Sequence, residues 1–203
     1  PREGYFEDSR FHHPDLAFRM DFPSGWRTQN SKQAVAAISP QEDAVIVLAV
    51  ATTNDPAGAL AEFLAPEGVQ AGERSEAPIH GLPAVRARFS AETEQGTLDG
   101  LVAYVKWGDL TYELLSYAPS AAWASRSAAV TGAMESFQEE TDPAVLGVTP
   151  DRLEIVTLPS AMTAGEFLRR YPSTFDDDAV LQLNRIGADE RLAAGTLMKR
   201  VVN

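Results

Sequence analysis

The stretch TLDGLVAYVKWGDLTYELLSYAP, residues 97–119, joins two runs of alternating apolar and polar residues through the pair Gly108-Asp109. Alternation with a period of two predicts strands whose successive side chains point to opposite faces of a sheet. A Gly-Asp pair between two such runs is typical of a two-residue β-hairpin. The sequence therefore favours an antiparallel sheet as the framework of the fold.

Further strands and two helices are predicted before and after this hairpin. The strands cover Leu16–Phe22, Ala34–Ile38, Ala44–Thr53, Val69–Ser75 and Ala84–Ala91. Asp55-Pro56 predicts the start of a short helix. Apolar residues at three-to-four spacing after Pro119 predict an amphipathic helix of about five turns. Many strands with few helices indicate an α+β fold in which helices cover an antiparallel sheet.

The segment EETDPAVLGVTP, residues 139–150, is acidic and interrupted by proline and glycine, which is typical of a linker. The charge balance changes there as well. The first 150 residues hold ten basic and twenty-one acidic side chains, and the rest of the chain holds seven and eight. We expect domains at residues 1–138 and 151–203, with a linker at 139–150 in which Glu139 and Glu140 are solvated.

The end of the chain has the pattern of a compact β-α-α-β unit. Leu153–Thr157 and Thr196–Val202 are predicted strands. Thr163-Ala164-Gly165-Glu166 has the form of a capping box at the start of a helix. Asp176–Asp178 precedes a second helix. Calcium binding is the alternative for these aspartates, but the spacing of an EF-hand is missing, so the helix N-cap is favoured.

Composition limits the classes of function. Of the 203 residues, 44% are hydrophobic and 23% charged, which is enough for a substantial core. No apolar run approaches the roughly 20 residues of a transmembrane helix. There is no cysteine, so disulfides and thiolate chemistry are excluded.

The chain starts at Pro1 with no signal-peptide pattern, so we expect a processed start or a piece of a longer protein. A net charge of -12 disfavours nucleic acid and anionic membrane surfaces as partners.

Motifs for catalysis are missing from the sequence. His12, His13 and His80 lack the H-E-x-x-H spacing of zinc peptidases. Neighbouring side chains on an extended segment point to opposite faces, so His12 and His13 cannot easily share one ion. We interpret the pair as surface residues at a strand edge. There is no G-x-S-x-G elbow and no glycine-rich phosphate loop. We therefore expect no catalytic residue, no metal ligand and no cofactor in this chain.

Four aromatic residues lie on the predicted hairpin: Tyr104, Trp107, Tyr112 and Tyr117. They form either a binding face or part of the core, and the core interpretation is favoured.

The C-terminal unit resembles a LysM module, a β-α-α-β unit that binds N-acetylglucosamine-containing glycans, in LEIVT, TAGEFLRRY, LQLN and RLAAGTLMKRVV. The family usually has Gly-Asp-Thr before the first helix and Pro-Gly near the last strand; only Thr163 and Gly195 match. The resemblance implies a binding site on the loops at Leu158–Met162 and Arg185–Arg191. The candidate binding residues are Ser160, Thr163, Asn184, Arg185 and Arg191. Without the Gly-Asp hydrogen bonds we expect little chitin binding and favour a protein partner or intramolecular docking.

The segment GYFEDSRFHHPDLAFRMDFPSGWRTQNSKQAVAAISP, residues 4–40, resembles the region after the catalytic domain of bacterial HtpX-like gluzincin metalloproteases. In these proteins a PsbP-like domain and a LysM-like tail follow the catalytic domain. The resemblance rests on Phe11, His13-Pro14, Phe18, Phe22-Pro23, Gly25-Trp26 and the tail. It implies zinc only in a catalytic domain outside this chain, and a location in the bacterial periplasm or cell envelope.

We therefore expect a non-catalytic C-terminal region of a zinc-dependent metalloprotease. Its partner would be a substrate or another protein, the attached protease domain, or peptidoglycan. One alternative is a free-standing PsbP-like module that binds protein or glycan, with no protease attached. A second alternative is an enzyme of unrecognised type that works through scattered carboxylates. An H-E-x-x-H motif upstream of this region would discriminate between them.

Overall fold

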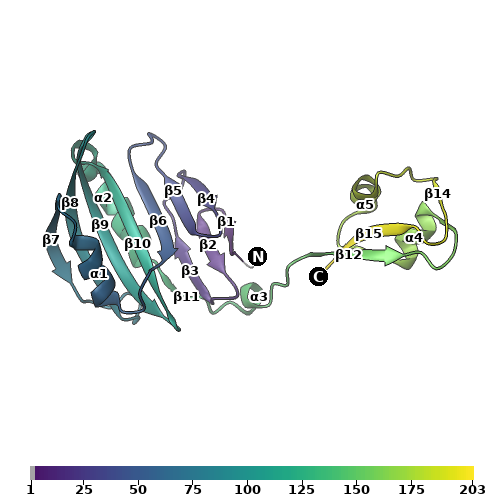
Figure 1. Cartoon of the computed structure of the whole chain (residues 1–203), viewed down its shortest axis with the longest axis horizontal. Helices are drawn as coiled ribbons and strands as arrows, with labels where there is room; N and C mark the ends of the chain where they lie inside the picture. Colours follow the sequence, from purple (N-terminus) through teal and green to yellow (C-terminus); the bar gives the residue numbers. More distant parts are fainter. Residues whose placement is uncertain (1–2) are drawn as a thin grey trace. The chain divides into compact units, whose positions relative to one another are not determined.

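The computed structural model describes residues 3–203 and divides into two compact units, one ending at Val148 and one spanning Thr149–Asn203. Figure 1 shows both units. No helix among the described residues is both long and apolar enough to cross a membrane.

The first unit contains two antiparallel sheets (Figure 1). The small sheet has the order β1 (Tyr5–Glu7), β2 (Arg10–His13), β3 (Phe18–Asp21), β11 (Gln138–Glu139). The large sheet has the order β4 (Arg27–Asn30), β5 (Ala34–Ile38), β6 (Val45–Val50), β10 (Leu110–Pro119), β9 (Gly96–Trp107), β8 (Ala84–Thr93), β7 (Val69–Ser75). The pairing of β6 with β10 joins an early meander of three strands to a later meander of four.

The predicted hairpin is confirmed and forms the middle of the large sheet. Leu110 pairs with Trp107 across the two-residue loop, and Gly108 has a φ of +55°. Further along, Gly100 faces Phe89 directly across β8 and β9. A Cβ on Gly100 would lie 2.3 Å from the Phe89 ring and 2.5 Å from the Ser116 carbonyl oxygen. Glycine is therefore required for this strand to pass under the ring.

Helices cover both faces of the large sheet. Helix α1 (Pro56–Leu64) begins at Asp55, whose carboxylate accepts from the amides of Ala57 and Gly58. It packs on the face that carries Phe89, Val102 and Tyr104. Helix α2 (Ser120–Glu135) and the small sheet cover the opposite face, where the main core lies. Members of this core include Phe11, Phe18, Met20, Ile46, Leu48, Leu114, Met134 and Phe137. The α+β fold with helices over an antiparallel sheet is thereby confirmed for this unit.

Most of the segment 139–150 folds as part of the first unit. This corrects the expectation that the whole segment is a linker. Strand β11 pairs with β3, and the amide of Glu140 donates to the carbonyl of Ala17. Helix α3 (Pro143–Leu146) follows, capped by Asp142, with Val145 buried. The prediction failed because this pairing joins segments about 120 residues apart and no local pattern announces it.

The second unit has a two-stranded sheet of β12 (Arg152–Thr157) and β15 (Leu197–Val202), and a short pair, β13 (Met162–Thr163) and β14 (Arg191–Leu192). Helices α4 (Ala164–Arg170) and α5 (Asp177–Asn184) lie between them in the chain. The predicted β-α-α-β order, the capping box of Thr163 and Glu166, and the N-cap of Asp176 are confirmed. The core residues are Leu158, Met162, Phe167, Val180, Leu192 and Met198.

Candidate binding site

Strand β2 turns its two histidines to opposite faces of the small sheet, as its extended backbone requires. His12 is only 4% exposed, whereas His13 is half-buried. Because β2 lies between β1 and β3, it is an interior strand. The prediction that both histidines lie at a surface strand edge is therefore wrong for His12. It is buried because a partner from the far end of the unit covers it.

That partner is Glu140, which is 1% exposed. His12 Nδ1 lies 2.5 Å from Glu140 Oε2, and the amide of Asp142 donates to Glu140 Oε1 at 3.0 Å. Burial acts to raise the pKa of Glu140, but the hydrogen bonds from the Asp142 amide and from His12 outweigh it and hold this pKa below its usual value. The expectation that Glu140 is a solvated linker charge is wrong.

The His12–Glu140 pair holds together two parts of the first unit that are far apart in the sequence. Among the described residues, no group hydrogen-bonds the buried Nε2 of His12, and the Oε2 of Glu7 lies 3.8 Å away. A histidine that acts as a general base for a nucleophile needs a hydroxyl or thiol within hydrogen-bond reach. The Tyr5 ring instead stacks on His12 with a centroid separation of 5.5 Å.

His13 faces the space between the two sheets. The amide of Leu16 donates to His13 Nδ1 at 3.2 Å. The His13 ring lies 5.3 Å from the Phe18 ring and 6.2 Å from the Phe11 ring, centroid to centroid. Burial lowers the pKa of His13 more than the nearby Asp15 raises it, so the ring is held neutral.

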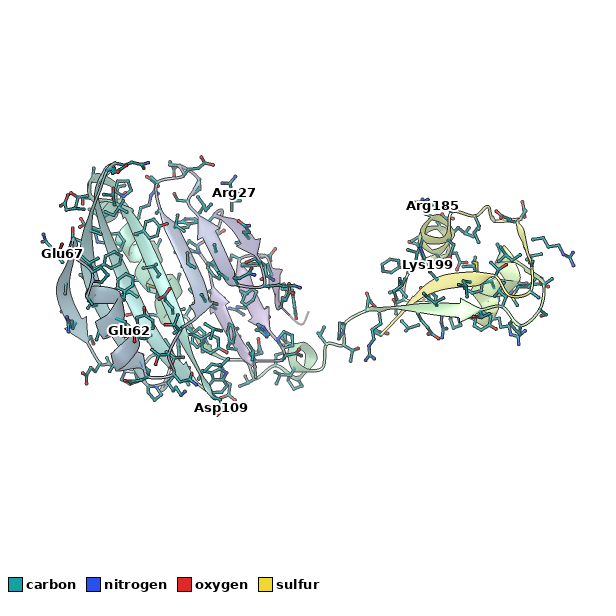
Figure 2. All side chains as sticks on the ribbon, viewed as in Figure 1. Arg27, Glu62, Glu67, Asp109, Arg185 and Lys199 are labelled. Carbon is teal, nitrogen blue, oxygen red and sulfur yellow. The ribbon has the colours of Figure 1, made fainter. Side chains whose placement is uncertain are left out.

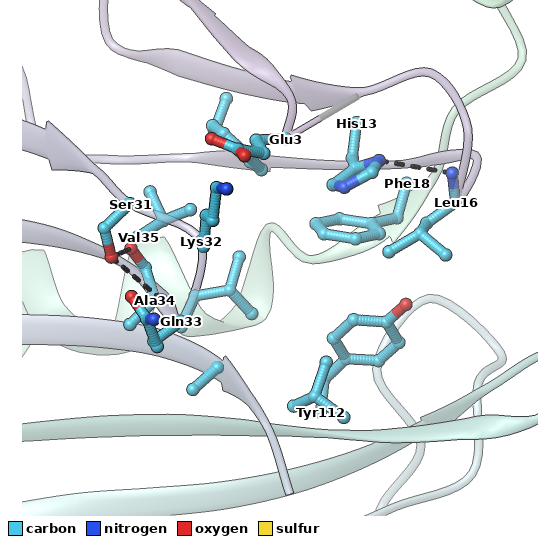
Figure 3. A pocket seen from close by; sticks show the side chains of 14 residues that line it. Glu3, His13, Leu16, Phe18, Ser31, Lys32, Gln33, Ala34, Val35 and Tyr112 are labelled. Atoms are coloured by element: carbon cyan, nitrogen blue, oxygen red, sulfur yellow. Dashed lines mark hydrogen bonds between the residues drawn. The ribbon is translucent and has the colours of Figure 1, made fainter. Parts of the chain in front are cut away.

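A pocket of about 140 Å³ opens beside His13, between the small sheet and the β4–β6 part of the large sheet (Figure 3). We call it the inter-sheet pocket. Its apolar lining comes from Phe11, Phe18, Val35, Leu48 and Val50. An apolar cavity of about 150 Å³ is large enough to hold benzene. The inter-sheet pocket therefore has room for one aromatic ring or branched aliphatic group.

Polar groups are few in this pocket and are placed around the apolar lining. Tyr112 lines it and is 2% exposed, and no described residue hydrogen-bonds its hydroxyl. Burial raises the pKa of Tyr112 to about 12, so the hydroxyl keeps its proton. Lys32 and Glu3 contribute an ammonium and a carboxylate (Figure 3). An apolar pocket with a small number of placed polar groups is the usual form of a ligand site.

Sequence reasoning assigned no binding role to His13 or Lys32, and it favoured the core for Tyr112. The core assignment holds for Tyr104 and Tyr112, which are 3% and 2% exposed. Trp107 also packs against the core, and its indole donates to the carbonyl of Leu16. In the sequence, the pocket was indicated only by two separate features: the alternating strand that follows His13, and the aromatic residue Tyr112 on the hairpin. Their proximity is a property of the fold.

The five residues predicted as binding residues all lie in the second unit. The Thr163 hydroxyl accepts from the Glu166 amide, and the Asn184 side chain bonds the backbone of Val180 and Lys199. Arg185 ends α5 with a φ of +56°, and Figure 2 labels both Arg185 and Lys199.

Arg191 pairs directly with Thr163 in the β13–β14 ladder, and Ser160 is exposed in the preceding loop. The fold thus brings Thr163 and Arg191 together at one ladder. Thr163 and Asn184 already use polar side-chain atoms within the unit. A binding role for the five stays a prediction.

Within residues 3–203, which the structure describes, no group of three or more His, Asp or Glu side chains is arranged to hold a metal ion.

Comparison with known proteins identifies a fold but not a family. No family model matches the chain, and no curated protein shows significant sequence similarity to it. Among solved structures, the cyanobacterial PsbP of Synechocystis covers 67% of this chain and 95% of its own at 12% identity, with a TM-score of 0.50. This likeness shows that the chain contains a PsbP-like domain, as predicted, and it shows the fold alone.

Two further structures are similar at lower TM-scores. A Pseudomonas aeruginosa protein of unknown function covers 61% of this chain and 92% of its own at 18% identity, with a TM-score of 0.44. Mycobacterium tuberculosis LpqN, described as involved in cell envelope biogenesis, covers 61% and 83% at 16% identity, also with a TM-score of 0.44.

Proposed function

We propose that this chain is a non-catalytic recognition region whose first unit binds an apolar group of its partner in the inter-sheet pocket. The observation that carries this proposal is an open, benzene-sized apolar pocket lined by the half-buried His13 and by the buried side chain of Tyr112. An aromatic or branched aliphatic group that enters this pocket is removed from water, which contributes about 25 cal/mol per Å² of apolar surface buried.

The proposal extends to the context of the chain. The region follows the catalytic domain of a zinc-dependent metalloprotease and presents substrate or a partner protein to it in the bacterial periplasm or envelope. The match of Phe11, His13-Pro14, Phe18 and Gly25-Trp26 to HtpX-like gluzincins supports this context. Zinc would belong to the protease domain. A free-standing PsbP-like module with the same pocket is the alternative, and an upstream H-E-x-x-H motif discriminates between the two.

The second unit is proposed to be a LysM-like module that contacts protein rather than chitin. Its β-α-α-β order supports the fold assignment. The polar atoms of Thr163 and Asn184 that bond within the unit are not available to a sugar. Arg185 and Arg191 are exposed cations that suit an acidic peptide or a carboxylate. Titration with chito-oligosaccharides should therefore give no saturable amide shifts at these residues at micromolar ligand, and such shifts would overturn this part of the proposal.

A titration with a neutral probe tests the pocket. Adding 3-phenylpropanol to the ¹⁵N-labelled chain should give saturable amide shifts around His13, Val35 and Tyr112, with millimolar affinity as expected for about ten non-hydrogen atoms. The substitution Val50→Trp places an indole at the pocket, where Val50 is 50% exposed, and should abolish these shifts.

The matched control is Leu153→Trp, which adds the same indole to a side chain that is 56% exposed in the second unit. It should leave the titration unchanged. Equal effects of the two substitutions, or shifts confined to other surfaces, would contradict the proposal.

A further inference from the structure

The tautomer of His13 is fixed by its backbone neighbour. An amide N–H can only donate, so the bond from Leu16 N to His13 Nδ1 requires a lone pair on Nδ1. In the neutral ring the proton is then on Nε2. Figure 3 shows the other ring nitrogen of His13 facing the space towards Lys32. The pocket therefore has a hydrogen-bond donor, and not an acceptor, at this position.

Among the remaining polar groups of the pocket, Lys32 is purely a donor. Its ammonium has three protons and no lone pair, whereas the Tyr112 hydroxyl and the Gln33 amide can each both donate and accept. Ser31 and Ala34 bond to each other through side chain and backbone, so they offer little to a ligand. Glu3 is the only acidic side chain on the lining, and it is exposed.

Two donors beside an apolar cavity, His13 Nε2 and the Lys32 ammonium, call for a ligand with an acceptor on an apolar body. A carboxylate satisfies them better than a carbonyl, because it has two acceptor oxygens and a charge that pairs with Lys32. The net negative charge of the first unit opposes a free anion only weakly, because salt at physiological strength screens exposed charges beyond about 8 Å. Glu3 lines the pocket itself, so this screening does not remove its repulsion of a carboxylate, which acts against the attraction to Lys32.

Building on the proposed function, we infer that the inter-sheet pocket selects a carboxylate attached to a benzene-sized apolar group. The ring or branched chain fills the space between Phe11, Phe18, Val35 and Leu48, and the carboxylate accepts from His13 Nε2 and Lys32. This chemistry is shared by two sources: the C-terminal residue of a peptide with an apolar side chain, and a free aryl- or alkyl-carboxylic acid.

Three probes of similar size and different charge test the inference on the full chain by NMR titration. They are 3-phenylpropionate, 3-phenylpropanol and 3-phenylpropylamine. The acid should bind at least about tenfold more tightly than the amine and several-fold more tightly than the alcohol, which is the range of one or two charge-assisted hydrogen bonds. Shifts at His13, Val35 and Tyr112 should accompany each bound probe.

Two substitutions assign the preference to named groups. His13→Phe keeps an aromatic ring and removes Nε2, so the acid should lose more affinity than the alcohol and most of its advantage over it. Lys32→Gln is an exposed change that leaves folding intact and should weaken the acid about threefold, with no change for the alcohol. His80→Asn removes the exposed third histidine away from the pocket and should change neither.

The outcomes separate this inference from the proposed function. Binding of all three probes with equal affinity would overturn carboxylate selection and leave the pocket as a recognition site. Failure of all three probes to shift pocket residues would overturn both the inference and the proposed function.

A peptide ending in Gly-Gly-Phe with a free carboxylate, compared with its C-terminal amide, then identifies the source of the carboxylate. Tighter binding of the free-acid peptide than of 3-phenylpropionate supports a protein C-terminus, and weaker binding supports a small carboxylic acid.

Discussion

His12 Nδ1 lies 2.5 Å from Oε2 of Glu140, a residue 128 positions later in the chain, and both side chains are buried. The pair connects the segment just after β11 to strand β2 of the small sheet. Removing one partner of a buried hydrogen-bonded pair leaves an unsatisfied polar group, which costs about 1–3 kcal/mol and more for a charged group. The free energy contributed by this pair is therefore a large share of the unfolding free energy of a domain of this size.

Glu140→Ala should lower the free energy of unfolding of the first unit by about 3 kcal/mol, because His12 and the Asp142 amide both lose their acceptor. Glu139→Ala, at the exposed neighbouring position, is the matched control and should change it by less than about 0.5 kcal/mol. Urea denaturation followed by tryptophan fluorescence measures both. Equal effects of the two substitutions would show that the buried pair does not hold the strand.

Stability should fall as pH is lowered, in two steps. The pKa values of His13 and Glu140 are both lower in the folded protein than their usual values near 6.5 and 4.5. Each group therefore contributes stability that is complete above its unfolded-state pKa and is lost as pH falls towards the folded one. The urea midpoint should decrease between about pH 7 and 5.5 because of His13, and again below about pH 4.5 because of Glu140.

The variant His13→Phe isolates the first of these steps. It should flatten the change in urea midpoint between about pH 7 and 5.5 and leave the step below about pH 4.5 in place. His80→Asn serves as the control and should keep both steps. A wild-type slope in the His13 variant would mean that another group titrates in this range.

Gly100→Ala should be strongly destabilising, by at least about 2 kcal/mol, because the new Cβ would overlap the Phe89 ring and the Ser116 carbonyl. Gly132→Ala is the contrasting change in helix α2. A Cβ there meets nothing within 4 Å, and alanine is favoured over glycine in a helix by about 1 kcal/mol, so this variant should be slightly stabilised. Thermal melts of the two variants should shift in opposite directions. A tolerated Gly100→Ala would mean that β8 and β9 pair in another register.

Limited proteolysis should cut first between Val148 and Asp151, where the first unit ends. Residues 138–146 are held by the β3–β11 ladder, by Glu140 and by helix α3, so they should resist cleavage. Mass spectrometry of the early fragments gives the cut site. First cleavage at 139–142 would show that this segment is the open connection that the sequence pattern indicates.

The parts of the fold that the sequence predicted are those determined by neighbouring residues. The Gly108 hairpin, the Asp55 and Asp176 caps and the capping box of Thr163 all follow from residues a few positions apart. The burial of His12 and Glu140 depends on strands at opposite ends of the unit, and their local sequence looks like that of a surface strand and a linker. The inter-sheet pocket was missed for the same reason, because its lining comes from separate strands and loops.

Intermolecular NOEs between 3-phenylpropionate and the methyl groups of the full chain test the central claim, a recognition site in the inter-sheet pocket, most directly. The exposed apolar side chains of the second unit offer a competing surface, because Leu153, Ile155 and Leu197 are 56%, 60% and 65% exposed. We predict NOEs from the phenyl ring to Val35, Leu48 and Val50, and their loss in Val50→Trp. NOEs only to Leu153, Ile155 and Leu197 would contradict a recognition site between the two sheets.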